Sequence, residues 1–344
     1  MFKDKIDTKL SSWRRSGTHA GDIGIELELE GNLKFMPPSA KFWLAKEEGS
    51  LRGGMEYILK EPVRIGDLPE ALQELEASLR TMKPKASIRC STHFHVNVNS
   101  LTVRQIYNIL GYYYLIENLL VSTQGPLRIG NLFCLRLTDA ESAMDSVLSS
   151  IRSKEYFRAF NISGFKYGAV NLAAPWKFGS LEFRFFRPIL DMRVMEMWAK
   201  ILYGIVHQAA HIPLDKACSA LSAGGLHNLL DMTLSSEQIS FILAQVNQNS
   251  VAEDLFQNFD HVCKMSYLLT RKEKFVIPDR FLDDDLSEEP FRLELAAHEE
   301  LMEAAEEAAP FPNGGSPFSL TLETEDSIPE DLDDYEDDFT FDED

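Results

Sequence analysis

The sequence predicts an α+β fold, in which a mixed and largely antiparallel sheet carries helices on one face. Three observations support this prediction. Short segments alternate polar and apolar residues, longer segments place apolar residues at helical spacing, and long connections separate the two kinds. Strands interleaved with helices in this way are typical of a sheet covered by helices.

The individual elements follow from these patterns. We expect strands at residues 22–31, 55–59, 88–99, 167–174 and 179–188, the last of which ends at a proline. Helical spacing covers 68–82 and a long apolar segment, 101–121, at whose start Thr102 and Gln105 have the spacing of a capping box. Residues 140–159 and most of 191–270 are also predicted to be helical.

Charge divides the chain of 344 residues into two parts. Residues 279–344 hold 25 acidic and two basic residues, whereas residues 1–278 hold 29 acidic and 32 basic residues. We therefore expect a catalytic domain at 1–278 and an acidic C-terminal region at 279–344. Within that region, 287–309 could form a helix, and 310–344 is expected to be a disordered tail that could bind a basic protein partner.

Composition also argues against several classes of protein. The body is not basic enough to indicate nucleic-acid binding, and no apolar run reaches membrane-spanning length. The four cysteines form no CxxC pair, which favours reduced thiols and a cytoplasmic protein. The sequence contains neither GxxxxGK[ST] nor GxGxxG, so we expect no P-loop and no Rossmann turn.

Three predicted strands carry ionisable side chains at alternate positions, where neighbours two apart share a face. These pairs are Glu26 with Glu28, His93 with His95, and Glu182 with Arg184. Each pair alone is typical of a solvated face or a surface ion pair. Together they indicate a cation site, because carboxylates with an imidazole are ligands for Mg²⁺ or Mn²⁺. A further histidine pair in "HQAAH" lacks the glutamate of HExxH, and we interpret it as structural.

The order of these motifs resembles the carboxylate–amine ligase superfamily, which includes glutamine synthetase, glutamate–cysteine ligase and amidoligases, several of them encoded by phages. The resemblance covers roughly residues 20–190. "GIELE" is similar to the first-strand motif of the family, which implies that Glu26 and Glu28 are metal ligands. "EGSLRGGME" resembles the second carboxylate pair and implies Glu48 and Glu56 as ligands, although Glu47 could replace Glu48.

The remaining motifs of the resemblance lie further along the chain. "THFHVN" implies His93 as a metal ligand, with His95 beside it in catalysis. "RIGNLFC" resembles a segment whose arginine, here Arg128, faces phosphate or a substrate carboxylate. "LEFRFFRP" resembles the closing motif, with Glu182 as ligand and Arg184 on phosphate.

The resemblance implies an ATP- and Mg²⁺-dependent ligase, with Mn²⁺ as a substitute, which forms an amide or isopeptide-type bond through an acyl phosphate. We also expect Arg187 and Lys166 to contact the nucleotide. Joining a carboxylate to an amine in water requires activation, and phosphoryl transfer requires cations that offset charge on the transferring oxygens.

Two alternatives remain open. One is phosphoryl transfer to a guanidino group on a related fold. The other is a binding protein with a decayed site that acts through its acidic tail. Neither the acid nor the amine substrate follows from the sequence.

Overall fold

The computed structural model describes residues 6–13, 21–129, 131, 134–161, 166–246 and 255–270, all of which belong to the unit Met1–Leu286. The expected domain boundary at 278, the helix at 287–309 and the tail at 310–344 lie outside these residues.

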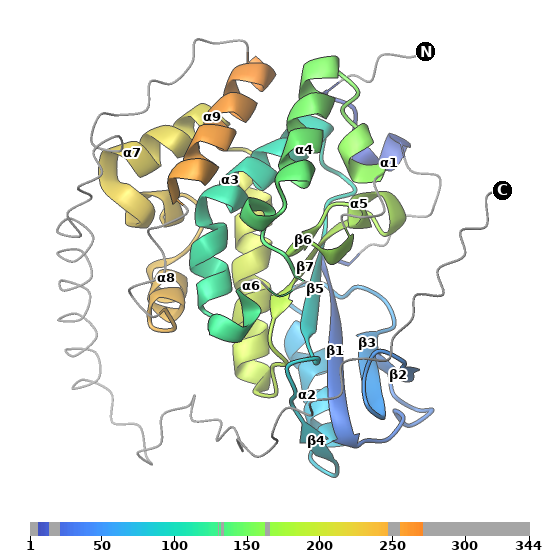
Figure 1. Cartoon of the computed structure of the whole chain (residues 1–344). Helices are drawn as coiled ribbons and strands as arrows, with labels where there is room; N and C mark the ends of the chain where they lie inside the picture. Colours follow the sequence, from blue (N-terminus) through green and yellow to red (C-terminus); the bar gives the residue numbers. More distant parts are fainter. Residues whose placement is uncertain are drawn as a thin grey trace, which may run out of the picture. The chain divides into compact units, whose positions relative to one another are not determined.

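An antiparallel sheet lies along one side of the longer helices (Figure 1). Its strands lie in the order β2 (Trp43–Glu48), β3 (Gly54–Leu59), β1 (Ile23–Asn32), β5 (Thr92–Asn97), β7 (Ser180–Phe186) and β6 (Val170–Asn171). A short strand, β4 (Lys83–Lys85), pairs with the end of β1. Every pairing between these strands is antiparallel.

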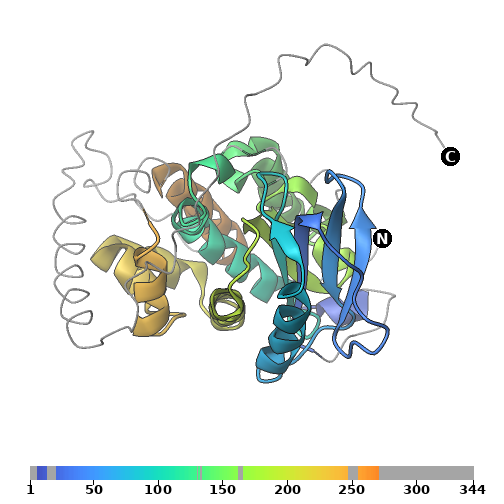
Figure 2. The ribbon, with the colours of Figure 1, turned by 90° about the horizontal axis from the view of Figure 1, so that it is seen from below.

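The longer helices are α2 (Leu68–Leu79), α3 (Val103–Ser122), α4 (Glu141–Ser153), α6 (Met192–Ala209), α7 (Leu214–Leu230), α8 (Ser236–Leu243) and α9 (Leu255–Thr270). Two short helices, α1 (Leu10–Trp13) and α5 (Ala174–Lys177), and three 3₁₀ turns, Pro126–Arg128, Leu137–Asp139 and Arg158–Asn161, complete the fold. Figure 2 shows the strands on one side and most of the helices on the other. The α+β prediction is therefore confirmed.

Aromatic side chains connect three helices to one face of the sheet, two through ring contacts and one through a hydrogen bond. The Tyr113 ring of α3 lies 5.7 Å from the ring of Phe183, and the Trp198 ring of α6 lies 5.0 Å from that of Phe186. On α2, the Ala71 carbonyl accepts a hydrogen bond of 2.7 Å from Nε1 of Trp43 in β2. Because the apolar residues of each strand alternate, this packing directs the intervening polar residues to the opposite face.

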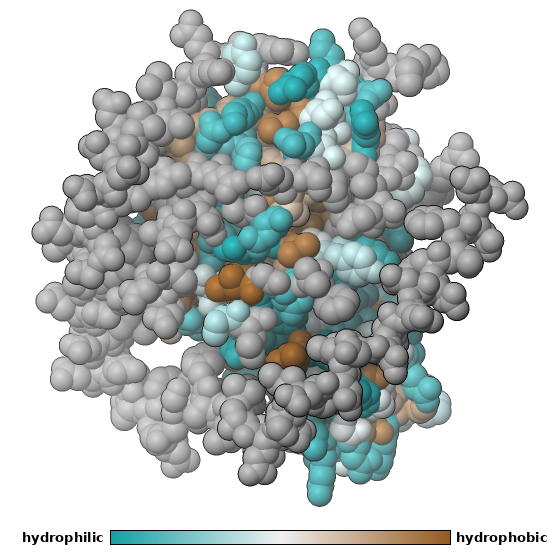
Figure 3. Space-filling view, in the orientation of Figure 1, coloured by the Kyte–Doolittle hydropathy of each residue, from teal (hydrophilic) through white to brown (hydrophobic). Residues whose placement is uncertain are grey.

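Strand β1 shows this alternation most clearly. Its apolar residues Ile23, Ile25, Leu27 and Leu29 are at most 1% exposed. The glutamates between them are less buried and lie on the face away from α2, α3 and α6. The surface seen in Figure 3 is accordingly mixed, with hydrophilic residues predominant around the end of the sheet at the lower right.

Several local predictions can be compared with the structure. The capping box at the start of α3 is confirmed, since Thr102 and Gln105 exchange hydrogen bonds of 3.3 and 2.9 Å. The strand expected at 167–174 is shorter, because β6 has only two residues and α5 follows it. Strand β2 was not predicted.

Two further expectations were reduced cysteines and no membrane-spanning segment. All four cysteines are free thiols, but Cys218 of α7 and Cys263 of α9, which are distant in sequence, have sulfur atoms only 3.9 Å apart. None of the helices in the described ranges is long and apolar enough to cross a membrane.

Candidate metal site

The polar face of the sheet places ionisable residues of adjacent strands opposite one another. In one row, His95 of β5 lies between Gly24 of β1 and Glu182 of β7, and Asn171 of β6 follows Glu182. In the next row, Glu26 lies opposite His93. In the third row, Glu28 lies opposite Glu56 of β3, which lies opposite Lys46 of β2.

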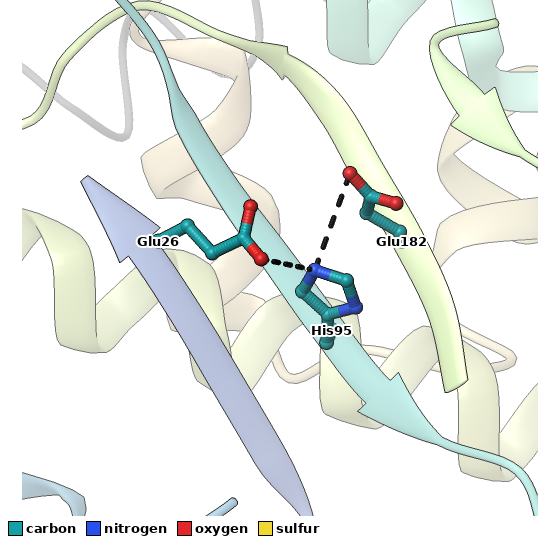
Figure 4. A group of neighbouring side chains, drawn as sticks. All are labelled: Glu26, His95 and Glu182. Atoms are coloured by element: carbon teal, nitrogen blue, oxygen red, sulfur yellow. Dashed lines mark ion pairs between the residues drawn. The ribbon is translucent and has the colours of Figure 1, made fainter. Parts of the chain in front are cut away.

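Three side chains from adjacent strands converge on this face: Glu26, His95 and Glu182 (Figure 4). One ligand atom from each lies within 4.8 Å of the other two. His95 Nε2 is 3.3 Å from Glu26 Oε1 and 4.0 Å from Glu182 Oε1. A side chain at Gly24 would crowd His95, since a Cβ there would lie 3.3 Å from His95 Cβ.

The triad Glu26, His95 and Glu182 fits a divalent cation. His95 Nε2 is buried without a hydrogen-bond partner, although it lies between two carboxylates. Its other ring nitrogen lies 3.1 Å from Ser180 Oγ, a contact that orients the ring as outer partners of metal-binding histidines do. Two carboxylates and one imidazole form a donor set for a divalent ion, with water or substrate completing the coordination.

Electrostatic coupling within the triad is strong. Burial by itself raises the pKa of Glu26, but the neighbouring imidazoles of His93 and His95 outweigh it and hold this pKa well below its usual range. At Glu182, burial also raises the pKa, but the charges of the neighbouring imidazoles and of Arg184 outweigh it, so this pKa is lowered. Burial lowers the pKa of His95, but Glu182 and Glu26 reverse this effect and raise it. A cation bound to this triad therefore competes with a proton on His95.

His93 lies beside the triad and has a partner at each ring nitrogen. Its Nδ1 is 3.1 Å from Glu26 Oε2, and its Nε2 is 2.8 Å from Ser91 Oγ. Ser91 in turn donates a hydrogen bond to Glu28. His93 Nδ1 also lies 3.8 Å from Glu182 Oε1. Because both of its ring nitrogens already have partners, His93 is placed to orient Glu26, and the unpartnered Nε2 favours His95 as the imidazole ligand where the sequence favoured His93.

The other predicted ligands lie further along the sheet. Glu56 is 5% exposed and pairs with Lys46 Nζ at 2.6 Å. Glu48 accepts hydrogen bonds of 3.1 and 2.9 Å from the backbone nitrogen and hydroxyl of Ser50. Glu47 lies opposite Met55, at alternate parity to Glu48, so it is directed away from the polar face. The structure therefore brings Glu28 and Glu56 to the polar face beside the triad, and leaves Glu48 at its edge.

Of the residues predicted to bind phosphate, Arg184 lies closest to the triad. Its guanidinium contacts Glu182 Oε1, its side chain is 22% exposed, and its Nε is buried without a hydrogen-bond partner. Arg128 is buried and donates to the Cys90 carbonyl oxygen, with Cys134 Sγ at 3.9 Å. Its guanidinium thus anchors the loop after α3, a structural role that the sequence did not indicate.

Arg187 and Lys166 are more exposed. Burial, together with the nearby charge of Arg128, lowers the pKa of Arg187, so these two guanidinium groups lie near each other. Lys166 Nζ lies 4.6 Å from the centre of the Tyr167 ring. A nucleotide-binding role for either residue stays a prediction.

Sequence reasoning missed four residues of the polar network: Lys46, Ser91, Asn171 and Ser180. Asn171 Nδ2 donates a hydrogen bond of 2.6 Å to Glu182 Oε2, which orients that carboxylate. The period-two pattern in "YGAVNLAA" could have placed this asparagine on the polar face. Lys46 could not have been found in this way, because its strand was not predicted.

A surface pocket of about 390 Å³ lies at another place, lined by Gly21, Lys41, Phe42, Pro62, Val63, Arg64, Asp67 and Glu70. None of the triad residues lines it, so the convergence of ligand atoms is the better guide to chemistry.

Comparisons with models of known protein families and with curated protein sequences found no match to this chain.

Proposed function

We propose that this protein is an ATP- and divalent-cation-dependent carboxylate–amine ligase, as its resemblance to amidoligases implies. The observation that carries the proposal is the convergence of Glu26, His95 and Glu182 from three adjacent strands, with Arg184 in contact with Glu182. An antiparallel sheet with one polar face and one helix-covered face fits this assignment.

The proposed reaction has two steps. A carboxylate oxygen of the acid attacks the γ-phosphorus of ATP, and ADP leaves. The amine then attacks the acyl carbon, the C–O bond to phosphate breaks, and the amine loses its proton to solvent. The products are an amide, ADP and inorganic phosphate.

Each residue of the site has a role in this scheme. Glu26, His95 and Glu182 would hold the cation, which when bound offsets negative charge on the phosphate oxygens. Arg184, anchored on Glu182 but partly exposed, can donate to those oxygens with its planar fork. Asn171 and His93 position the two carboxylates through their hydrogen bonds.

A cytoplasmic location belongs to the same proposal, since all four cysteines are free thiols. Binding of a basic protein partner by the tail, residues 310–344, stays a prediction, because these residues lie outside the described ranges.

The test is a screen of ATP turnover by the purified protein with pooled carboxylic acids and amines. Release of ADP and phosphate should depend on both substrates, and mass spectrometry should find a product lighter than their sum by one water. Glu182→Gln serves as the inactive control. ADP without free phosphate, together with a phosphorylated guanidino compound, would instead support phosphoryl transfer, and no substrate-dependent turnover in any pool would count against both.

A further inference from the structure

We infer that Lys46 takes the place of a second cation beside Glu28 and Glu56, so that the polar face of the described sheet holds one divalent ion rather than two. This inference rests on the proposed function and concerns the composition of its site. The central observation is the ion pair of 2.6 Å between Lys46 Nζ and Glu56 Oε2. The two residues lie directly opposite each other on β2 and β3.

The burial of Glu56 makes this pair more than a surface contact. The Glu56 side chain is 7% exposed, whereas that of Lys46 is 56% exposed. A carboxylate removed from water to this extent requires a cation or a proton. Lys46 can reach it from solvent because its long apolar stem lies along the edge of the sheet while the ammonium points inward.

The surroundings of the pair are anionic. Glu28 lies opposite Glu56 on the next strand, and Glu26 lies two residues before Glu28. Burial and the charge of Glu26 raise the pKa of Glu56 to about 7, although Lys46 opposes them. The close Glu56 carboxylate raises the pKa of Lys46, and the charges of Glu26 and Glu48 add to this effect. Negative charge therefore accumulates at the point where the ammonium lies.

The neighbouring carboxylates already have other partners. Glu26 faces His93 and His95, and Glu28 accepts a hydrogen bond from Ser91. Glu56 pairs with the Lys46 ammonium, which supplies the positive charge that a second metal ion would otherwise supply. Lys46 is thus a positioning residue, which acts through Glu56 and does not itself belong to the triad.

The experiment measures Mn²⁺ binding by equilibrium dialysis, with neither ATP nor substrates present. Wild-type protein should bind one ion per chain. Lys46→Met removes the ammonium but keeps the apolar stem, so this variant should bind two ions. Lys46→Arg should still bind one, and adding Glu56→Gln to Lys46→Met should restore one.

Lys41→Met is the matched control, because Lys41 also forms an ion pair, of 2.9 Å with Glu70, but both side chains are more than 60% exposed. Its Mn²⁺ stoichiometry should equal that of wild type. Glu56→Gln in the wild-type background is a second test if Lys46→Met does not fold. It should still bind one Mn²⁺ per chain, whereas loss of a ligand of the bound ion would remove the binding that the dialysis measures.

Two ions on wild-type protein, or one ion on a folded Lys46→Met, would overturn the inference while leaving the ligase proposal intact. Absence of Mn²⁺ binding to wild-type protein would overturn both. Failure of the ATP screen with the expected stoichiometries would overturn only the ligase proposal.

Discussion

Glu182→Gln offers the sharpest test of the triad, because it removes one charge and keeps the size of the side chain. Glu182 is 3% exposed. One of its oxygens accepts the hydrogen bond of 2.6 Å from Asn171, and the other contacts Arg184 and faces His95. The variant therefore replaces a buried anion surrounded by donors with a neutral amide.

The cost to folding can be estimated from these contacts. The glutamine carbonyl can still accept from Asn171, but its NH₂ group then faces Arg184 and His95, which are themselves donors. Loss of a charge-assisted hydrogen bond costs about 1.5–3 kcal/mol. Because Arg184 is 22% exposed, water compensates part of this loss, and we expect the free energy of unfolding to fall by about 1–2 kcal/mol.

The larger effect should appear when a metal ion is added. At an Mn²⁺ concentration one hundred times the Kd, binding stabilises the folded wild-type protein by about 2.7 kcal/mol. Removing one of two anionic ligands should abolish most of this gain. The assay is urea unfolding of wild type and variant, each with and without Mn²⁺.

Glu30→Gln is the matched control on the same face of β1. Glu30 accepts a hydrogen bond of 3.1 Å from the backbone nitrogen of Arg52 and lies outside the triad. Its replacement should change stability by less than about 0.5 kcal/mol and keep the full Mn²⁺ effect. An undiminished Mn²⁺ effect in Glu182→Gln would refute the assignment of this carboxylate as a ligand.

Three further outcomes are expected. His95→Gln should abolish Mn²⁺ stabilisation, measured by the same unfolding assay, since His95 supplies the only nitrogen of the triad. Asp191, the N-cap of α6, has a pKa that is lowered chiefly by its hydrogen bond with Arg193. Its contribution to the free energy of unfolding is therefore present above the ordinary aspartate pKa and is lost as the pH falls through the lowered pKa. Asp191→Ala should therefore cost about 1 kcal/mol at pH 7 and less near pH 3, as urea unfolding at the two pH values would show. A mild thiol oxidant should join Cys218 to Cys263, detected as a loss of two hydrogens by mass spectrometry, because their sulfur atoms are 3.9 Å apart. Persistence of both free thiols after unfolding and refolding in the oxidant would contradict this.

The sequence was sufficient to assign side chains to faces of strands. In "GIELELEG" and "THFHVN" the alternation separates apolar from ionisable residues. Burial in β1 follows that alternation, whereas in β5 His93 is buried like its apolar neighbours. The capping box at Thr102 was equally visible, since it depends only on residues three apart. These features are local, and local patterns suffice to predict them.

The choice between His93 and His95 could not be made in this way. Both share a face, so alternation treats them as equivalent. What distinguishes them is the register of β5 against its neighbours, which sets His95 opposite Glu182 and His93 opposite Glu26. Register depends on contacts between segments far apart in the chain, and a single sequence does not state it.

Strand β2 shows the same limit and has the larger consequence. "WLAKEE" has only two buried or half-buried apolar residues, Trp43 and Ala45, and a run of charges, so it lacks the pattern of a strand. The hairpin with β3 nevertheless brings Lys46 opposite Glu56, ten residues later in the chain. On this polar face, the carboxylates thus meet an ammonium, a guanidinium and two imidazoles contributed by other strands or by neighbouring positions. Because the ammonium and the guanidinium already offset part of the negative charge, the number of divalent ions that the face can hold is set by its pairing partners and not by its count of glutamates.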